Sequence, residues 1–567
     1  MSSLGGVLFG QLLSPVFIRR IFGEKFMAPG TRLSFSLMEH LMGAGTAVVS
    51  SHSSGSWTHL IDPNRRWYNN WRIIALNGWV VLFLITASTN GYDGSMMNGL
   101  QSLTQWEEAF NHPTGGMLGL LNAIQNIGCL DPFVPYVSDG IGRRPTILLG
   151  AFLMCVATAI QTASNSVKMF IGARFLIGFG LTFAANSAPM LVSEISYPPY
   201  RASLTSMYNS LWYAGSIVAA WTTFGSFKIP SSWAWRLPSL LQGLPSAIQV
   251  LLVCFAPESP RWLVAKGRDA QALKTLAYYH ADGNENDPLV QYEFEEIKAA
   301  IGVERSVVSN VGWSAFLKRG NLKRLRIIVA IAFFSQWSGN GLVSFYLNKV
   351  FDAIGITDPT IQLLINGILQ IWNLLVALIA SFLVERVGRR ILFISSCVGM
   401  LVFFTLQTVC SAIFAKTGAD GAAHAVIAFI FLFYGAYDIA FTPLIVSYTV
   451  EILPYEVRAK GLTIFNFSVS LSLIFNQYVN PIALGKLGWR YYIVYCCWIA
   501  FELAFCFIYI VETKGLTLEE TAALFDGEEA KEKIEQKATN LATELHEVQE
   551  KILETPTSTS HQDIHKA

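Results

Sequence analysis

Long apolar runs alternate with short polar segments along most of this chain. A bilayer-spanning helix needs about 20 apolar residues to cross a hydrocarbon core roughly 30 Å thick. The runs that meet this length lie near residues 73–95, 116–138, 146–165, 168–193, 203–225, 236–257, 326–349, 361–385, 391–414, 424–448, 462–484 and 490–511. The pattern predicts an all-α membrane protein with twelve transmembrane helices.

Polar segments divide these runs into two groups of six. The predicted parts are an N-terminal tail (1–72), a six-helix bundle (73–257), a central loop (258–325), a second six-helix bundle (326–511) and a C-terminal tail (512–567). Within the first tail, residues 5–18 are apolar but too few to span a bilayer, which favours an interfacial or loosely ordered segment. Lys and Arg near the helix ends place both termini and the central loop in the cytoplasm.

Three short signatures recur in the same order in both halves. SDGIGRRP after the second run matches VERVGRR after the eighth, and EISYPPYR after the fourth matches EILPYEVR after the tenth. APESPRW after the sixth run matches VETKG after the twelfth. Because each pair is roughly 250 residues apart, the chain is interpreted as two homologous halves. Parallel repeats of this kind build one class of alternating-access transporter.

The repeated signatures carry acidic and basic residues at the predicted cytoplasmic helix ends. They are Asp139, Arg143, Arg144, Glu194, Arg201, Glu385, Arg389, Arg390, Glu451 and Arg458. Opposite charges there can form a network between helices that holds the two halves closed on the cytoplasmic side. Opening that side would break the network, so these residues are predicted to form a gate. The alternative is that the arginines only anchor the topology.

Composition narrows the possible functions. The chain is 52% hydrophobic and 14% charged, where a soluble domain carries about 25% charged residues. A net charge of +1 gives no reason to expect a nucleic-acid partner. The eight cysteines are scattered without ligand spacing, so we expect no disulfide framework and no metal site. No nucleophile–base pair or phosphate loop is recognisable, so we expect neither an enzyme nor a cofactor.

Six stretches together resemble the sugar porter family of the major facilitator superfamily. They are SDGIGRRP, GARFLIGFG, PESPRWLVAKGR, SQWSGNGLVSFY, VERVGRR and VETKGLTLEE, and the resemblance covers roughly residues 73–525. QWSGNGLVSFY and YDIAFTPLIVSYTVEILPYEVRAKG are further similar to fungal sugar transporters of the lactose-permease type. The resemblance implies a twelve-helix fold, a sugar site between the halves near the bilayer midplane, and either uniport or proton symport.

Asp93 stands at the predicted end of the first span, in GYDGSMMNGL, where an ionised carboxylate is expensive. The resemblance implies that Asp93 is the proton acceptor of proton-coupled members and that Arg174 is its partner. Contact with the arginine favours the charged carboxylate, and burial favours the protonated form once the two separate. Protonation and helix movement would then be linked. A structural ion pair, or a carboxylate that only caps the helix end, remains an alternative.

The family also implies a set of polar side chains that bracket the sugar hydroxyls. Carried over position by position, these are Asn209, Gln336, Asn340, Tyr346, Asn373, Asp438 and Asn476. Tyr346 is equally compatible with ordinary packing. Ser335 replaces the first glutamine of the seventh-helix motif, and Val446 stands where hexose porters place a tryptophan. A pocket without that aromatic wall favours a disaccharide over a hexose.

We therefore expect a proton-coupled importer of a disaccharide or hexose in the plasma membrane, functional as a monomer. Its expected partners are a small sugar, a proton and the lipid bilayer. Transport of another polyhydroxylated metabolite, or facilitative uniport, is the alternative within transport. A transporter-like nutrient sensor is the alternative from another class. Asp131, inside the second span, has no counterpart in the family pattern.

Overall fold

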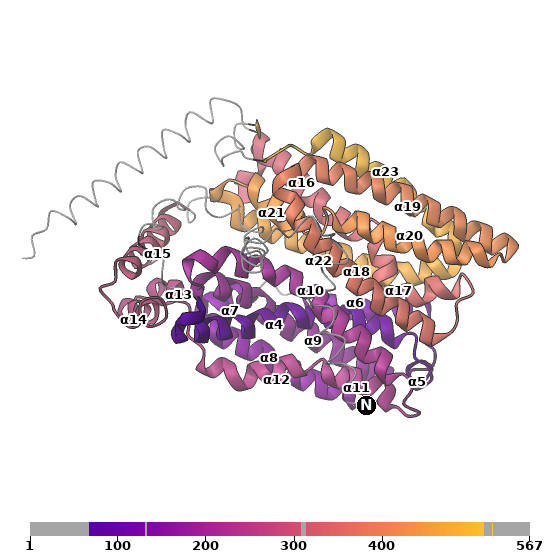
Figure 1. Cartoon of the computed structure of the whole chain (residues 1–567), viewed down its shortest axis with the longest axis horizontal. Coiled ribbons are helices and arrows are strands. Elements are labelled where there is room, and N and C mark those ends of the chain that lie inside the picture. The colour runs from indigo at the N-terminus through magenta and orange to yellow at the C-terminus, as the bar shows by residue number, and fades with distance from the viewer. Residues whose placement is uncertain (1–59, 61–66, 131–132, 308–312, 515–523, 526–567) are drawn as a thin grey trace, which may run out of the picture. The chain divides into compact units, whose positions relative to one another are not determined.

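The computed structural model describes residues 60, 67–130, 133–307, 313–514 and 524–525 (Figure 1). Asp131 and the apolar segment 5–18 lie outside the described residues, so the interfacial or loosely ordered state of that segment stays a prediction. The helices of the first half are η3 (Trp67–Asn69), α4 (Trp71–Leu100), α5 (Thr104–Ala109), α6 (Gly115–Gly128), α7 (Val134–Ile141), α8 (Arg143–Thr162), α9 (Val167–Ile195), α10 (Pro198–Ser226), α11 (Trp233–Leu241), α12 (Leu244–Leu252) and η4 (Val253–Phe255).

The central loop and the second half are also helical. The central loop contains α13 (Pro260–Ala265), α14 (Asp269–His280) and α15 (Pro288–Val307). The second half contains η6 (Trp313–Leu317), α16 (Arg319–Trp337), α17 (Asn340–Asp352), α18 (Pro359–Val387), α19 (Arg389–Thr417), α20 (Asp420–Asp438), α21 (Leu444–Ile452), α22 (Tyr455–Leu487), η7 (Gly488–Arg490) and α23 (Tyr491–Tyr509).

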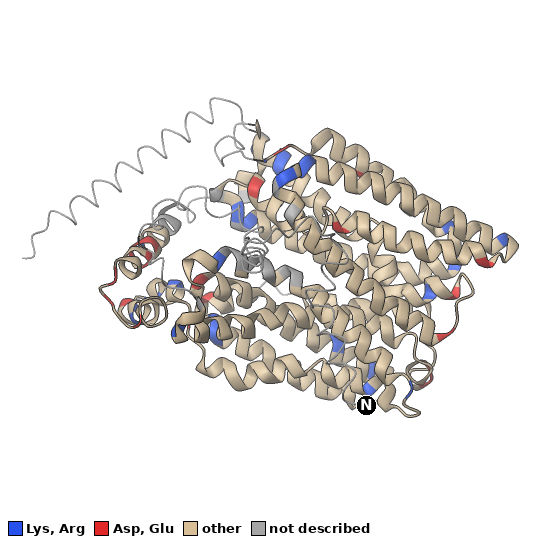
Figure 2. Ribbon diagram, viewed as in Figure 1, with Lys and Arg blue, Asp and Glu red and all other residues tan. Residues whose placement is uncertain are grey.

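Helices occupy the described part of every predicted span, and the twelve-helix fold is confirmed. Within the described residues, nine helical stretches are long and apolar enough to cross a membrane. One of these, Lys460–Tyr509, joins the last two spans, and α6 is too short to qualify at 14 residues. Figure 2 shows the transmembrane helices mostly free of charge, with Lys, Arg, Asp and Glu gathered at their ends and on α14 and α15.

Four of the spans are built from two helices each, namely α6–α7, α11–α12, α16–α17 and α20–α21. The break in the seventh span has a clear cause, because Gly339 adopts φ +97°, a conformation that favours glycine. A Cβ there would also lie 2.6 Å from the ring of Phe404. Discontinuous helices place backbone polar groups at membrane depth, which is tolerated where they meet protein or line a cavity.

Glycines allow neighbouring helices of the first half to approach closely. A Cβ on Gly91 of α4 would lie 1.8 Å from the carbonyl oxygen of Trp212 on α10, and a Cβ on Gly215 would lie 1.8 Å from that of Ser88. The Ser216 hydroxyl donates to the Gly91 carbonyl at 2.9 Å. Small residues at such crossings are the usual way in which transmembrane helices gain packing contacts.

The two halves contact each other through α4 with α17, α6 with α22 and α10 with α18. Several of their shared hydrogen bonds gather where α4 ends. Gln101 Nε2 donates to the Phe345 carbonyl at 2.9 Å, and Asn348 Nδ2 donates to the Gln101 carbonyl at 2.9 Å. Asn98 accepts from the backbone N–H of Leu347 at 3.1 Å. These contacts hold the halves together at the end opposite the arginine signatures.

Candidate functional site

Asp93 and Arg174 form an ion pair inside the first bundle. Arg174 Nη1 on α9 lies 3.2 Å from Asp93 Oδ1 on α4, and the two side chains are 2% and 1% exposed. The sequence placed Asp93 at a helix end, but α4 continues to Leu100. Asp93 is therefore inside the helix and is not a cap, since its carboxylate faces a neighbouring helix.

Two glutamines complete the surroundings of this pair. Gln242, between α11 and α12, donates from Nε2 to Asp93 Oδ1 at 2.8 Å. Gln125 on α6 accepts from Arg174 Nη2 at 2.7 Å, and Arg174 Nε donates to the Leu121 carbonyl at 2.8 Å. The sequence analysis did not single out either glutamine. The only feature that could have identified them is a polar amide inside an apolar run. Asp93 Oδ2 has no hydrogen-bond partner among the described residues.

The ion pair is therefore held by four helical segments: Arg174 of α9 and Gln242 contact the carboxylate of Asp93 on α4, and α6 contacts Arg174. Asp93 Oδ1 is held by a charged and a neutral donor, whereas Oδ2 is buried and has no donor among the described residues. The donors stabilise negative charge on Oδ1, while Oδ2 remains able to take up a proton. Such an arrangement can exist in both protonation states, and changing the state would change the attraction between α4 and α9.

The predicted sugar residues of the second half gather at the break in the seventh span. Asn476 Nδ2 on α22 donates to the Gln336 carbonyl at 2.7 Å. Asn340 Nδ2 donates to the Ser335 carbonyl at 3.0 Å, and Tyr434 donates to the Asn340 carbonyl at 2.8 Å. The structure thus brings Gln336, Asn340 and Asn476 together around backbone groups that the break leaves without helical partners.

The other predicted sugar residues lie elsewhere. The Tyr346 hydroxyl donates to the Gln477 carbonyl, so this fully buried ring packs between helices. Asn373 on α18 is 2% exposed, and its Oδ1 has no hydrogen-bond partner among the described residues. The side chain of Asn209 is outside the described residues, so its role stays a prediction.

Asp438 is held by a partner from the opposite half. Tyr213 on α10 donates its hydroxyl to Asp438 Oδ1 at 2.6 Å, and Thr442 Oγ1 donates to the same oxygen at 2.6 Å. Asp438 is fully buried, and its Oδ2 has no hydrogen-bond partner among the described residues. Tyr213 was not singled out from the sequence, because an isolated tyrosine in an apolar run carries no recognisable signal.

The repeated charged signatures form matching networks in the two halves. In the first, Arg143 lies 2.9 Å from Asp139 Oδ1 and 3.4 Å from Glu194 Oε2. In the second, Arg389 Nη2 lies 3.0 Å from Glu451 Oε1. These ion pairs link helices within one half. The predicted network that holds the two halves closed stays a prediction.

Two glutamates from the exit signatures cap the helices that begin with the arginine pairs. Glu258 accepts from the backbone N–H groups of Arg143 and Arg144 at 3.2 Å each, and Glu512 accepts from those of Arg389 and Arg390 at 2.8 and 3.1 Å. Burial raises the pKa of Glu258 above 4.5, although these N–H bonds oppose it. Carboxylates at helix N-termini satisfy orphan donors and complement the helix dipole.

The remaining signature residues have other partners. Arg144 Nη1 donates to the Ala256 carbonyl at 3.0 Å, and Arg390 Nη2 donates to the Phe507 carbonyl at 2.9 Å. Arg458 Nε donates to the Leu453 carbonyl at 3.3 Å. The side chain of Glu385 lies outside the described residues.

Arg201 contacts the central loop. It pairs with Glu293 of α15 at 3.0 Å, whereas the sequence grouped it with Glu194. His280 Nδ1 of α14 lies 2.7 Å from the other oxygen of Glu293, and its Nε2 lies 3.2 Å from the Ile195 carbonyl. Burial alone would raise the pKa of Glu293, but the charges of His280 and Arg201 outweigh it and lower this pKa from 4.5. This cluster fastens α14 and α15 to the ends of α9 and α10.

Known proteins resemble this chain over most of its length. A family model described as sugar (and other) transporter matches residues 79–525. The MFS-type transporter oryC of Aspergillus oryzae is 28% identical over 78% of this chain and 85% of its own length. The high-affinity glucose transporter of Kluyveromyces lactis is 26% identical over 78% of this chain and 84% of its own length.

Solved structures share the fold. An inward-open conformation of the xylose transporter XylE from E. coli superimposes with a TM-score of 0.66. The match covers 80% of this chain and all of that chain at 22% sequence identity. At this identity the likeness concerns the fold alone.

Proposed function

This chain belongs to the sugar (and other) transporter family, and we propose that it is a proton-coupled sugar symporter working by alternating access. The ion pair between Asp93 and Arg174 is the observation that carries the proposal. A charge pair this deeply buried in a transmembrane bundle is costly, which makes it a functional candidate by default. Asp93 Oδ2, which is buried and has no hydrogen-bond partner among the described residues, supplies a position for the transported proton.

The coupling follows from the surroundings of the carboxylate. While Asp93 is charged, Arg174 and Gln242 both hold Oδ1, and α4, α9 and the α11–α12 break are joined. Protonation removes the attraction to Arg174 and releases α4 from α9. α4 also contacts α17 of the second half. Release of α4 from α9 would therefore make it easier for the two halves to change their relative arrangement.

Replacing Asp93 tests the coupling. Asp93→Asn should abolish sugar-driven proton uptake and accumulation driven by a pH gradient, while exchange of labelled sugar across the membrane survives. Proteoliposomes with an internal pH dye report both quantities. Asp420→Asn, an exposed carboxylate in the first turn of α20, is the matched control and should transport normally. Concentrative uptake by the Asp93→Asn variant would exclude Asp93 as the coupling site.

For the cargo, we propose a disaccharide or a hexose, imported across the plasma membrane by a protein with both termini in the cytoplasm. Gln336, Asn340 and Asn476 meet at the break between α16 and α17, and amides are suited to bracketing hydroxyl groups. The resemblance aligns Val446, on α21, with a tryptophan of hexose porters, and the smaller side chain favours the disaccharide.

A substrate screen separates the remaining possibilities. Uptake of lactose, cellobiose and glucose should be measured in a yeast strain without its own sugar transporters, with the external pH recorded at the same time. Disaccharide uptake accompanied by external alkalinisation is the expected result. Hexose-only uptake would refute the disaccharide, and uptake without a pH change would favour a uniporter. Signalling without uptake would support a nutrient sensor.

A further inference from the structure

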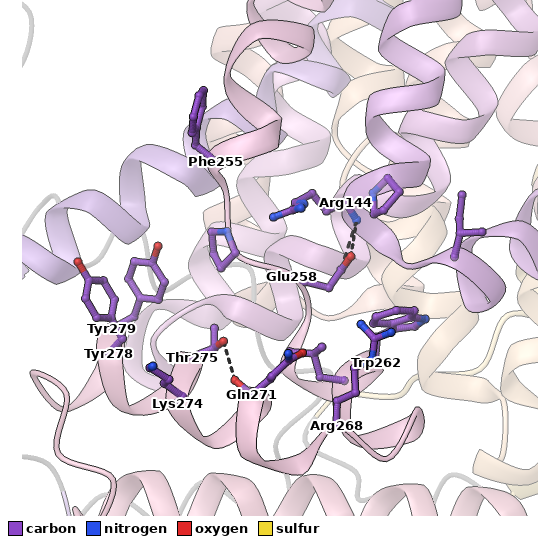
Figure 3. Close-up of a pocket in the computed structure, with 14 residues that line it drawn as sticks. Arg144, Phe255, Glu258, Trp262, Arg268, Gln271, Lys274, Thr275, Tyr278 and Tyr279 are labelled. Atoms are coloured by element: carbon purple, nitrogen blue, oxygen red, sulfur yellow. Dashed lines mark hydrogen bonds between the residues drawn. The ribbon is translucent and has the colours of Figure 1, made fainter.

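A cavity of about 570 Å³ lies beside the first arginine signature, between the start of α8, the end of the sixth span and α14 (Figure 3). Figure 3 shows residues of α14 along one wall, with Arg144 and Glu258 on the other. The volume falls within the range typical of small-molecule sites, about 300–1,000 Å³. None of the transport chemistry proposed above uses this cavity.

Positive charge dominates the lining. Arg144, Arg268 and Lys274 face a single carboxylate, Glu258, so the cavity carries an excess of two positive charges. Glu258 is already engaged by the backbone N–H groups at the start of α8. Asp269, next to Arg268 in sequence, pairs instead with Lys298 at 3.3 Å. Arg144 already donates to the Ala256 carbonyl, and the Arg268 guanidinium lies 5.6 Å from the centre of the Trp262 ring. Among the described residues, neither Arg268 nor Lys274 has a carboxylate partner, so their charges can attract an anion, and guanidinium groups are well suited to phosphate.

The cavity also borders the lipid-facing surface of the sixth span. Phe255 lines it and is 73% exposed, and Leu251 one turn earlier is 70% exposed. Tyr278 and Tyr279 line the opposite wall, as expected at a membrane–water interface. A ligand in this cavity would have its charged part among the cations and an apolar part along Phe255 and Leu251.

We propose that this cavity binds the phosphorylated headgroup of an anionic lipid of the phosphoinositide class. Basic cavities at the cytoplasmic ends of transmembrane helices are suited to such headgroups. The proposal rests on the cytoplasmic orientation given above, but not on proton coupling or on the identity of the sugar. Because Trp262 in the cavity wall donates to the Asp139 carbonyl at 3.0 Å, a bound lipid would brace the first arginine signature against α13.

Binding can be measured directly by native mass spectrometry of the full-length protein. The probe is phosphatidylinositol 4,5-bisphosphate in mixed micelles with phosphatidylcholine. The test variant is Arg268→Gln combined with Lys274→Gln, two side chains at the solvent-exposed wall. At about 1 kcal/mol for each cation, binding should weaken about thirtyfold. Lys318→Gln with Lys323→Gln removes the same charge from exposed positions near the start of α16 and should bind normally.

Further outcomes decide between sources of the phosphate. Equal weakening in both double variants would refute a specific site and indicate general charge attraction. Soluble inositol 1,4,5-trisphosphate should compete only weakly, because it lacks the chains that would lie along Phe255 and Leu251. Equal affinity for this soluble headgroup would overturn the assignment to a lipid. Normal melting temperatures of both double variants serve as the folding control.

Discussion

At the residue scale, Glu293 illustrates how one buried carboxylate joins the central loop to the membrane helices. The two nitrogens of the His280 ring lie 2.7 Å from Glu293 Oε2 and 3.2 Å from the Ile195 carbonyl oxygen. Arg201 supplies a second cation. A carboxylate with two cationic partners can be accommodated at 4% exposure only because all three groups are hydrogen-bonded.

This cluster predicts a pH dependence for the central loop. Since the folded-state pKa of Glu293 is lowered from 4.5, its stabilisation is fully present above pH 4.5 and is lost as the pH falls through the lower folded value. Hydrogen exchange of α14, corrected for intrinsic rates, should therefore stay slow at neutral pH and accelerate in acid.

The matched variants test whether Glu293 is responsible. Glu293→Gln should cost about 1–3 kcal/mol, because it removes the carboxylate that pairs with the buried His280 and the partly exposed Arg201. It should expose α14 to exchange already at neutral pH. Glu295→Gln, on the exposed side of α15, should leave the exchange unchanged. Protection of α14 in both variants would show that the loop is held by its apolar contacts alone.

At the element scale, the crossing of α4 and α10 depends on glycine. The carbonyl oxygen of Ser88 occupies the position that a Cβ on Gly215 would need, and backbone cannot move aside as a side chain does. Gly215→Ala should therefore separate the two helices and destabilise the bundle by about 1–3 kcal/mol, measured as a lower melting temperature in detergent.

Gly225→Ala supplies the control on the same helix. Its added Cβ would meet nothing within 4 Å, so the substitution should be neutral or slightly stabilising. If both variants melt alike, helix propensity and not close approach would explain the behaviour of Gly215.

At the scale of the whole molecule, the buried hydrogen bond from Tyr213 of α10 to Asp438 of α20 joins the two halves. A typical intramolecular hydrogen bond contributes about 0.5–1.5 kcal/mol. Tyr213→Phe should therefore reduce the population of this arrangement of the two halves about two- to tenfold relative to an arrangement in which they separate here.

Distances between spin labels placed on α10 and α18 measure that shift. Tyr136→Phe, an exposed hydroxyl on α7, should leave the distance distribution as in the unmodified protein. An unchanged distribution in Tyr213→Phe would mean that the contact forms in both arrangements and does not distinguish them.

The sequence by itself determined the twelve spans and the two halves. It could do so because hydrophobic length and repeated signatures are properties of segments, which a bilayer selects without reference to tertiary contacts. Family-specific motifs added the pairing of Asp93 with Arg174, two residues far apart along the chain.

Only the tertiary structure decided which groups share a site. Gln125 and Gln242 reach the ion pair, Tyr213 reaches Asp438, and the arginine signatures pair within each half. These contacts depend on how helices rotate and approach, which is set by close packing at positions such as Gly215. The pattern of apolar residues determines whether a helix spans the membrane. The direction in which one of its polar side chains points depends on the neighbours that pack around it.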